Sequence, residues 1–111
     1  MEISEDTRLE IHEMELTLAE LREKYVGDSE VWDKHIRTFL DFGKNHVVAA
    51  LDAGADFFIV RPDQLQKLEV AVHMYRHCLP EGHPIRTEYT GEQVERYLEV
   101  ARGEVNRFKS K

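Results

Sequence analysis

The sequence has few of the residues that build covalent or metal frameworks. Its 111 residues include one cysteine, Cys78, which excludes an intrachain disulfide and a cysteine-based zinc or iron–sulfur site. No apolar run approaches the ~20 residues of a membrane-spanning helix. The first six residues carry three acids where a signal peptide carries bases. We therefore expect a soluble cytoplasmic protein that does not enter a membrane.

Positive charge is also scarce. Lysine and arginine total 15 against 22 aspartates and glutamates, which gives a formal net charge of -7. The basic residues are scattered singly along the chain, so no basic face would overcome the repulsion of a phosphate backbone. The composition therefore predicts no nucleic-acid partner.

Motifs for catalysis are missing as well. The six glycines never fall into the spacing of a dinucleotide-binding or phosphate-binding loop. Ser4, Ser29 and Ser110 lie at a terminus, a helix cap and a tail, and none stands in a nucleophile turn. The paired Glu-x-x-His pattern of di-iron bundles is absent too. We predict no catalytic residue and favour a non-enzymatic protein.

What the sequence does contain is helical periodicity. Thr17 and Glu20 form a capping box, and residues 7–16 before it mix helix formers without glycine or proline. One helical stripe collects Ile11, Met14, Leu18, Leu21 and Tyr25, whereas Leu9 and Leu16 fall on the opposite side. This pattern favours one long first helix with two contact faces. The alternative is a break in the chain before Thr17.

A second helix is expected after the stop-and-cap signal at Gly27, Asp28 and Ser29. It would run from about Glu30 to the C-cap candidate Gly54, with the broadest apolar face of the chain, which predicts the central helix. That face comprises Trp32, Ile36, Phe39, Leu40, Gly43, Val47, Ala50 and Leu51. The glycine within it indicates a close crossing by another backbone, or else a tolerated glycine or a kink.

Two further helices complete the predicted fold. The third begins at Pro62, ends before Pro80, and carries an apolar stripe of Leu65, Leu68, Val72, Tyr75 and Leu79. The last opens with Thr90 and Gln93 as a second capping box and carries Val94, Tyr97, Leu98, Ala101, Val105 and Phe108 on one face. The sequence therefore predicts an all-α, four-helix bundle-like single domain over residues 1–111.

Residues 57–60 form a short apolar run that is expected to be buried and extended, because aromatic and β-branched residues dominate it. An alternative fold pairs this run with residues 85–89 on either side of the third helix. That arrangement would make a small βαβ unit over residues 57–89 within an α+β domain.

Six histidines are the compositional oddity of the chain. Glu69, His73 and His77 recur every fourth residue on the third helix, a spacing that lets two imidazoles share a divalent transition metal. On a helical wheel they lie about 100° from the apolar stripe, so we expect this face to meet solvent. A tight site would need further ligands, for which Cys78 and His83 are the candidates.

The other histidines do not indicate a metal site. His35 and His46 lie along one flank of the second helix, about 16 Å apart, and are expected at the border of the core beside Phe39 and Phe42. His12 stands among glutamates and is predicted to lie on the surface.

Three functions remain open from the sequence. The leading hypothesis is a protein-interaction module, homodimeric or bound to another protein, that uses the second face marked by Leu9 and Leu16. The alternative is a metal-binding or metal-responsive protein that uses Glu69, His73 and His77. The third is a small enzyme with a pocket around His35 and His46.

Overall fold

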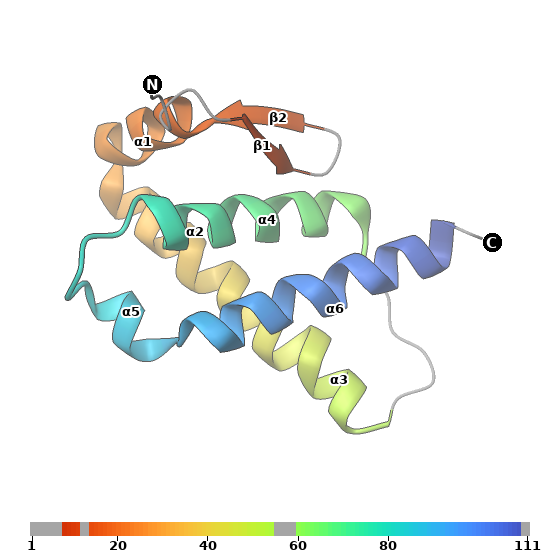
Figure 1. Ribbon diagram of the computed structural model, residues 1–111. Helices are drawn as coiled ribbons and strands as arrows, with labels where there is room; N and C mark the ends of the chain where they lie inside the picture. Colours follow the sequence, from red (N-terminus) through yellow and green to blue (C-terminus); the bar gives the residue numbers. More distant parts are fainter. Residues whose placement is uncertain (1–7, 12–13, 55–59, 110–111) are drawn as a thin grey trace.

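The computed structural model describes residues 8–11, 14–54 and 60–109, without the side chains of residue 10 and residues 106–109. Its elements, in chain order (Figure 1), are β1 (Arg8–Ile11), β2 (Met14–Thr17), α1 (Leu18–Gly27), α2 (Ser29–Phe42), the π-helical η2 (Gly43–Val48), α3 (Ala49–Asp52), α4 (Pro62–His77), α5 (Pro84–Glu88) and α6 (Gly91–Lys109). The prediction of a predominantly helical, bundle-like fold is confirmed. Within these residues, no helix is both long and apolar enough to cross a membrane.

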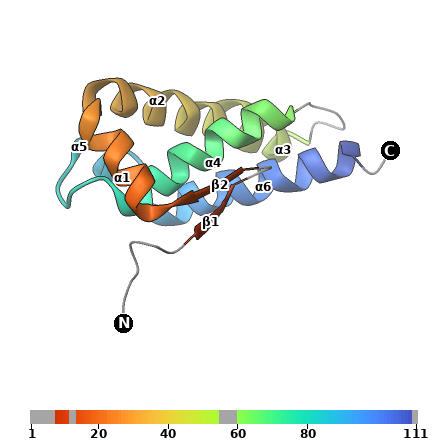
Figure 2. The same ribbon diagram turned by 90° about the horizontal axis from the view of Figure 1, so that it is seen from above.

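The central helix of the fold is α4. It lies between α2 and α6 (Figure 2) and also contacts α1 and β1. Because neighbours surround it, α4 is buried on more than one side, at Leu65, Leu68, Glu69, Val70, Ala71, Val72, His73, Met74 and Tyr75. The sequence prediction gave this place to the helix from about Glu30 to Gly54, which was wrong, since its counterparts α2, η2 and α3 bury fewer residues fully, namely Ile36, Leu40, Gly43, Val47 and Val48.

The predicted long first helix was also wrong. The strands β1 and β2 pair antiparallel there, and the helix begins only at Leu18. Ile11 is buried, whereas Arg8 and Glu15 are exposed. The guanidinium of Arg8 lies 3.6 Å from a carboxylate oxygen of Glu15 and forms an ion pair with it across the strands. This alternation has the period of two that is typical of a strand with one covered face.

The hairpin rules out the predicted interaction face at Leu9 and Leu16. They are directly paired in the strand register, and both are partly buried against the core. The two-sided helix that suggested them as an interaction face therefore does not form. Their shared side of the hairpin packs on the protein itself.

Both predicted capping boxes form, and the one at Thr17 starts α1 as in the alternative of a break before this residue. The amide of Glu20 donates to Oγ1 of Thr17 at 3.1 Å, and the amide of Gln93 donates to Oγ1 of Thr90 at 3.2 Å. α4 begins at Pro62, as expected from its fixed φ.

The predicted stop signals agree only in part. Gly54 has a φ of 76° just after α3, as expected of a glycine that follows a helix. Gly27 does not adopt such a conformation. One residue, Asp28, joins α1 to α2, and its side chain makes no cap hydrogen bond.

The alternative βαβ unit is not present. Residues 84–88 form the helix α5, which the sequence analysis did not predict, and Tyr89 follows it with its backbone carbonyl accepting a 2.6 Å hydrogen bond from Tyr75. Of the predicted extended run 57–60, residues 57–59 lie outside the described part of the chain, and Val60 is buried, as expected.

Gly43 marks a close crossing of two helices, which is one of the two interpretations that the sequence left open, and the contact is with a side chain of α6. A Cβ atom added at this glycine would lie 2.7 Å from Cβ and 2.9 Å from Cγ of Tyr97. Because Tyr97 is itself buried, neither atom can move aside easily. The absence of a side chain at position 43 lets α6 pack directly on η2.

Gly43→Ala should therefore destabilise the fold, by about 1–3 kcal/mol, because the added methyl overpacks the contact with Tyr97. Gly103→Ala on α6 is the matched control, since nothing lies within 4 Å of its added Cβ. That control should gain up to about 1 kcal/mol from helix propensity. Urea unfolding measures both, and equal effects of the two substitutions would contradict the assigned crossing.

Candidate functional site: an aromatic seam on α2

Five rings follow one another along α2 and into η2. We call this row, Trp32, His35, Phe39, Phe42 and His46, the aromatic seam. Successive ring centroids lie 5.1, 4.9, 6.1 and 4.9 Å apart, in edge-on, tilted, edge-on and stacked arrangements. These distances lie in the range of favourable aromatic contacts, so each ring supports the next.

The spacing of the seam is that of a coiled coil. Trp32, Phe39 and His46 recur every seven residues, and His35 and Phe42 fall between them at alternating steps of three and four. The residues that α2 and η2 bury fully in the core are different ones, namely Ile36, Leu40, Gly43, Val47 and Val48. The helix therefore carries a core face and, beside it, a row whose members Trp32, Phe39 and Phe42 also pack against the edge of the core.

The seam remains partly accessible. Its first four residues have intermediate exposure and His46 is exposed. Beyond the seam lie Val31, which is 57% exposed, and the exposed Thr38 and Asn45, all at the same heptad position and all uncharged. An aromatic row with a neutral border is the kind of surface that forms the centre of protein interfaces.

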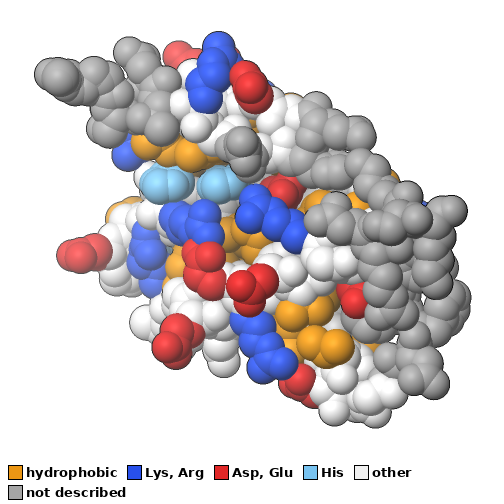
Figure 3. Space-filling model, turned by 45° about the vertical axis from the view of Figure 1, so that its right-hand side comes forward, with side chains coloured by type: hydrophobic (Ala, Val, Ile, Leu, Met, Phe, Trp, Pro, Cys, Tyr) orange, Lys and Arg blue, Asp and Glu red, His pale blue; other side chains and the backbone are white. Residues whose placement is uncertain are grey.

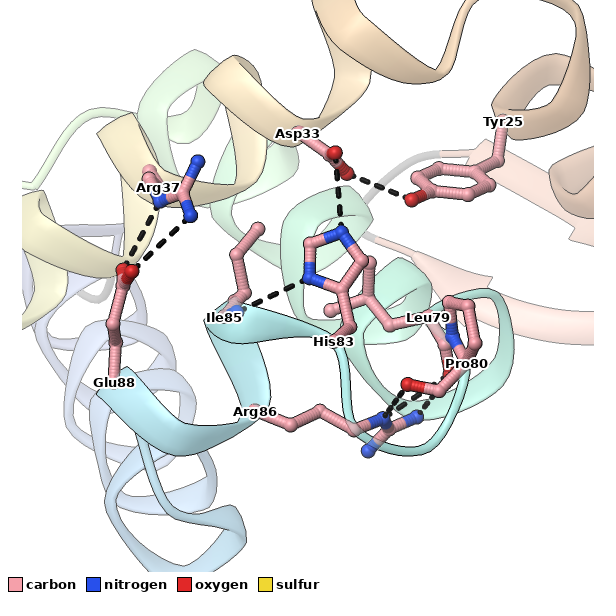
Figure 4. Close-up of polar contacts among 9 residues, drawn as sticks. All are labelled: Tyr25, Asp33, Arg37, Leu79, Pro80, His83, Ile85, Arg86 and Glu88. Carbon is pink, nitrogen blue, oxygen red and sulfur yellow. Dashed lines mark hydrogen bonds and ion pairs between the residues drawn. The ribbon is translucent and has the colours of Figure 1, made fainter.

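The opposite flank of α2 is occupied by polar contacts (Figure 4). Asp33 accepts a 2.8 Å hydrogen bond from the hydroxyl of Tyr25 on α1, and its other oxygen lies 3.1 Å from Nε2 of His83. Nδ1 of His83 accepts from the amide of Ile85 at 3.1 Å. Because an accepting Nδ1 carries no proton, the hydrogen of the neutral imidazole sits on Nε2 and points at Asp33.

This flank ties α5 and the turn before it to the rest of the protein. Arg37 makes a two-pronged ion pair with Glu88, at 3.0 and 3.1 Å. Arg86 donates to the carbonyl of Leu79 at 2.8 Å and so satisfies backbone groups beyond the end of α4. The polar side chains of this cluster form hydrogen bonds and ion pairs within the protein, which indicates a structural role.

Burial raises the pKa values of two tyrosines on this side of α2. It raises the pKa of Tyr25 to about 12, with a further contribution from the neighbouring Asp33. The pKa of Tyr89 is raised by burial and by its hydrogen bond to Asp41. Both hydroxyls are thus held in the protonated, donating form near neutral pH.

The two histidines of the seam lie where the sequence predicted, beside Phe39 and Phe42. His35 packs between Trp32 and Phe39, and its Nε2 lies 3.2 Å from the backbone carbonyl of Lys67 on α4. His46 stacks on Phe42 at an interplanar angle of 18°. The two imidazoles belong to a packed row, an arrangement that does not favour a shared catalytic pocket.

The face of α4 proposed for metal binding is not the solvent-exposed face that was predicted. Glu69 and His73 are only 2% and 6% exposed, because α4 has neighbours on this side as well. Glu69 accepts a 2.8 Å hydrogen bond from Nε of Arg102 on α6. Figure 3 shows one face of the protein on which two histidine side chains lie beside basic and acidic ones.

His73 and His77 do lie together, with nearly parallel rings whose centroids are 6.2 Å apart. Burial and the nearby Arg76 and Arg22 lower the pKa of His77. Yet among the residues that the structure describes, no three histidine, cysteine, aspartate or glutamate side chains gather as a metal-binding group.

The further ligands suggested by the sequence do not complete such a group. His83 is engaged with Asp33. Cys78 is half-buried, and burial raises the pKa of its thiol to about 11, which disfavours the thiolate that binds metals. His12 lies outside the described residues.

The pair of Glu69 and Arg102 should matter for stability. Arg102→Met leaves a buried carboxylate without this partner, so we expect a loss of about 2 kcal/mol or more, reduced from the fully buried case because the arginine is partly exposed. Arg96→Met is the control on the same helix, since its pair with Asp52 is exposed on both sides. It should cost at most about 1 kcal/mol. Similar losses in urea unfolding would contradict the assignment.

His35 should make the protein sensitive to acid. Burial lowers its pKa in the folded state, although the Lys67 carbonyl opposes part of this shift. As pH falls through the ordinary histidine range near 6.5, the unfolded chain therefore takes up a proton before the folded chain does, and stability falls. His35→Gln should lose less unfolding free energy than the wild type between neutral and mildly acidic pH. The free energy of unfolding, measured with urea, should be plotted against pH for both proteins. Parallel curves for the wild type and the variant would contradict this interpretation.

Comparison of the chain with protein-family models, with curated proteins and with solved structures gives no match. A function must therefore be inferred from the side chains of this chain alone.

Proposed function

We propose that this chain is a non-enzymatic helical module that binds an amphipathic helix of a protein through the aromatic seam. The observation that carries the proposal is the row of five rings at coiled-coil spacing, which stays partly exposed although Trp32, Phe39 and Phe42 also pack against the edge of the core. Aromatic side chains lose little entropy and bury much area on binding, which is why they dominate interface energetics.

The border of the seam supports a helix as the occupant. Heptad spacing places a side chain at every third or fourth residue as a knob. Each knob can insert into a hole between the side chains of a second helix. The uncharged Val31, Thr38 and Asn45 at the edge impose no charge requirement on the incoming surface. An apolar stripe on a partner helix would therefore find a complementary row without having to bury a charge.

Site-specific photo-crosslinking tests the proposal. A benzoylphenylalanine at position 38, on the border of the seam, should form adducts with a small number of discrete proteins in an extract of the cells that make this chain. The same probe at position 26 is the control, because Val26 lies on α1 and is 78% exposed. Adding Val31→Glu should abolish the adducts, since it would bring a charge into the buried interface.

Three outcomes of this experiment are informative. Adducts that form at position 38, fail at position 26 and disappear with Val31→Glu support the module, and their masses identify the partner. Adducts of equal yield at both positions, or none at position 38, overturn it.

A further inference from the structure

The aromatic seam is arranged almost symmetrically about Phe39. Trp32 lies seven residues before it and His46 seven residues after it, while His35 and Phe42 lie four before and three after. When two copies of a helix pack antiparallel across a two-fold axis, a residue before the axis faces the residue equally far behind it. At this seam, therefore, Trp32 would meet His46 of the second copy and Phe39 would meet Phe39, while His35 would lie one residue out of step with Phe42 of the second copy.

The border of the seam has the same symmetry. In antiparallel pairs of this kind, equivalent edge positions face one another, so that with an axis between positions 38 and 39 Thr38 would lie beside Thr38 of the second copy, and Val31 beside Asn45 of the second copy. These side chains are exposed and uncharged. Neither of these edge pairs would bring two like charges together.

Charge favours this face over others of the same chain. Two copies with a net charge of -7 each repel one another, so a self-contact must form where acidic side chains are few. Over residues 29–48 the acidic and basic side chains balance, with Glu30, Asp33 and Asp41 against Lys34, Arg37 and Lys44. Asp33 and Asp41 are bonded to other parts of the chain on the opposite flank. The seam is thus a neutral strip on an acidic protein.

We infer that the occupant of the seam is a second copy of this chain, packed antiparallel through α2 and η2 across a two-fold axis near Phe39. This inference rests on the proposed function and names its partner. The α-helical part of the paired seams, from Trp32 to Phe42, would run for roughly 15 Å at a rise of about 1.5 Å per residue, and the π-helical η2 would extend it to His46. Such an isologous contact closes on itself and ends at a dimer.

A charge-swap experiment at position 38 tests both the dimer and its axis. The full-length chain should sediment as a dimer in analytical ultracentrifugation. Thr38→Glu and Thr38→Lys should each raise the dissociation constant at least about tenfold, because each places like charges face to face. An equimolar mixture of the two variants should restore the dimer, because opposite charges then meet at the axis.

Val26→Glu is the control, since it adds the same negative charge at an exposed site on α1. It should leave the dissociation constant unchanged. Thr38 is exposed, so the variants should retain the helical circular dichroism of the wild type.

Other results would overturn the inference. A wild-type monomer, a dimer indifferent to Thr38→Glu, or a mixture that fails to recover the dimer each excludes a two-fold axis at this position. A monomeric chain that still crosslinks from position 38 to a different protein refutes the second copy but leaves the interaction module intact. A monomer without crosslinks refutes both.

Discussion

The fold depends on the burial of α4 on more than one side. A helix with one apolar stripe can satisfy only one neighbour, whereas α4 contacts α2, α6, α1 and β1. Its surface therefore includes Glu69 and His73, polar residues inside the protein, and Glu69 requires a cation to compensate its charge. Arg102 supplies that cation from α6. The packing of α6 and the burial of the carboxylate on α4 thus depend on each other.

Three sides of α2 and η2 perform different tasks. One packs in the core, where Gly43 admits Tyr97. A second holds α5 through ion pairs and hydrogen bonds, with Asp33 and His83 at its centre. The third carries the aromatic seam. Since the core and the polar contacts already hold this helix in place, they would lower the entropic cost of the binding proposed for the seam.

Much of the fold could be predicted from local chemistry. The capping boxes at Thr17 and Thr90 and the proline at Pro62 mark helix starts, because they depend on residues three or four positions apart. The strands were missed because Arg8–Ile11 and Met14–Thr17 suit a helix almost as well as a hairpin. An isolated hairpin is marginally stable in water. The alternating Leu9, Ile11, Met14 and Leu16 were the available signal, and packing against the core decided the outcome.

For the site, the sequence by itself determined which side chains share a flank of α2, since helical spacing places His35 and His46 beside Phe39 and Phe42. It also determined that this flank is neutral within an acidic chain. Only the tertiary structure decided that the seam stays partly exposed at the edge of the core while Glu69 and His73 become buried. The reason is physical: a helical period fixes which residues lie together on one face, but whether that face meets water or protein depends on neighbours that are distant in the sequence.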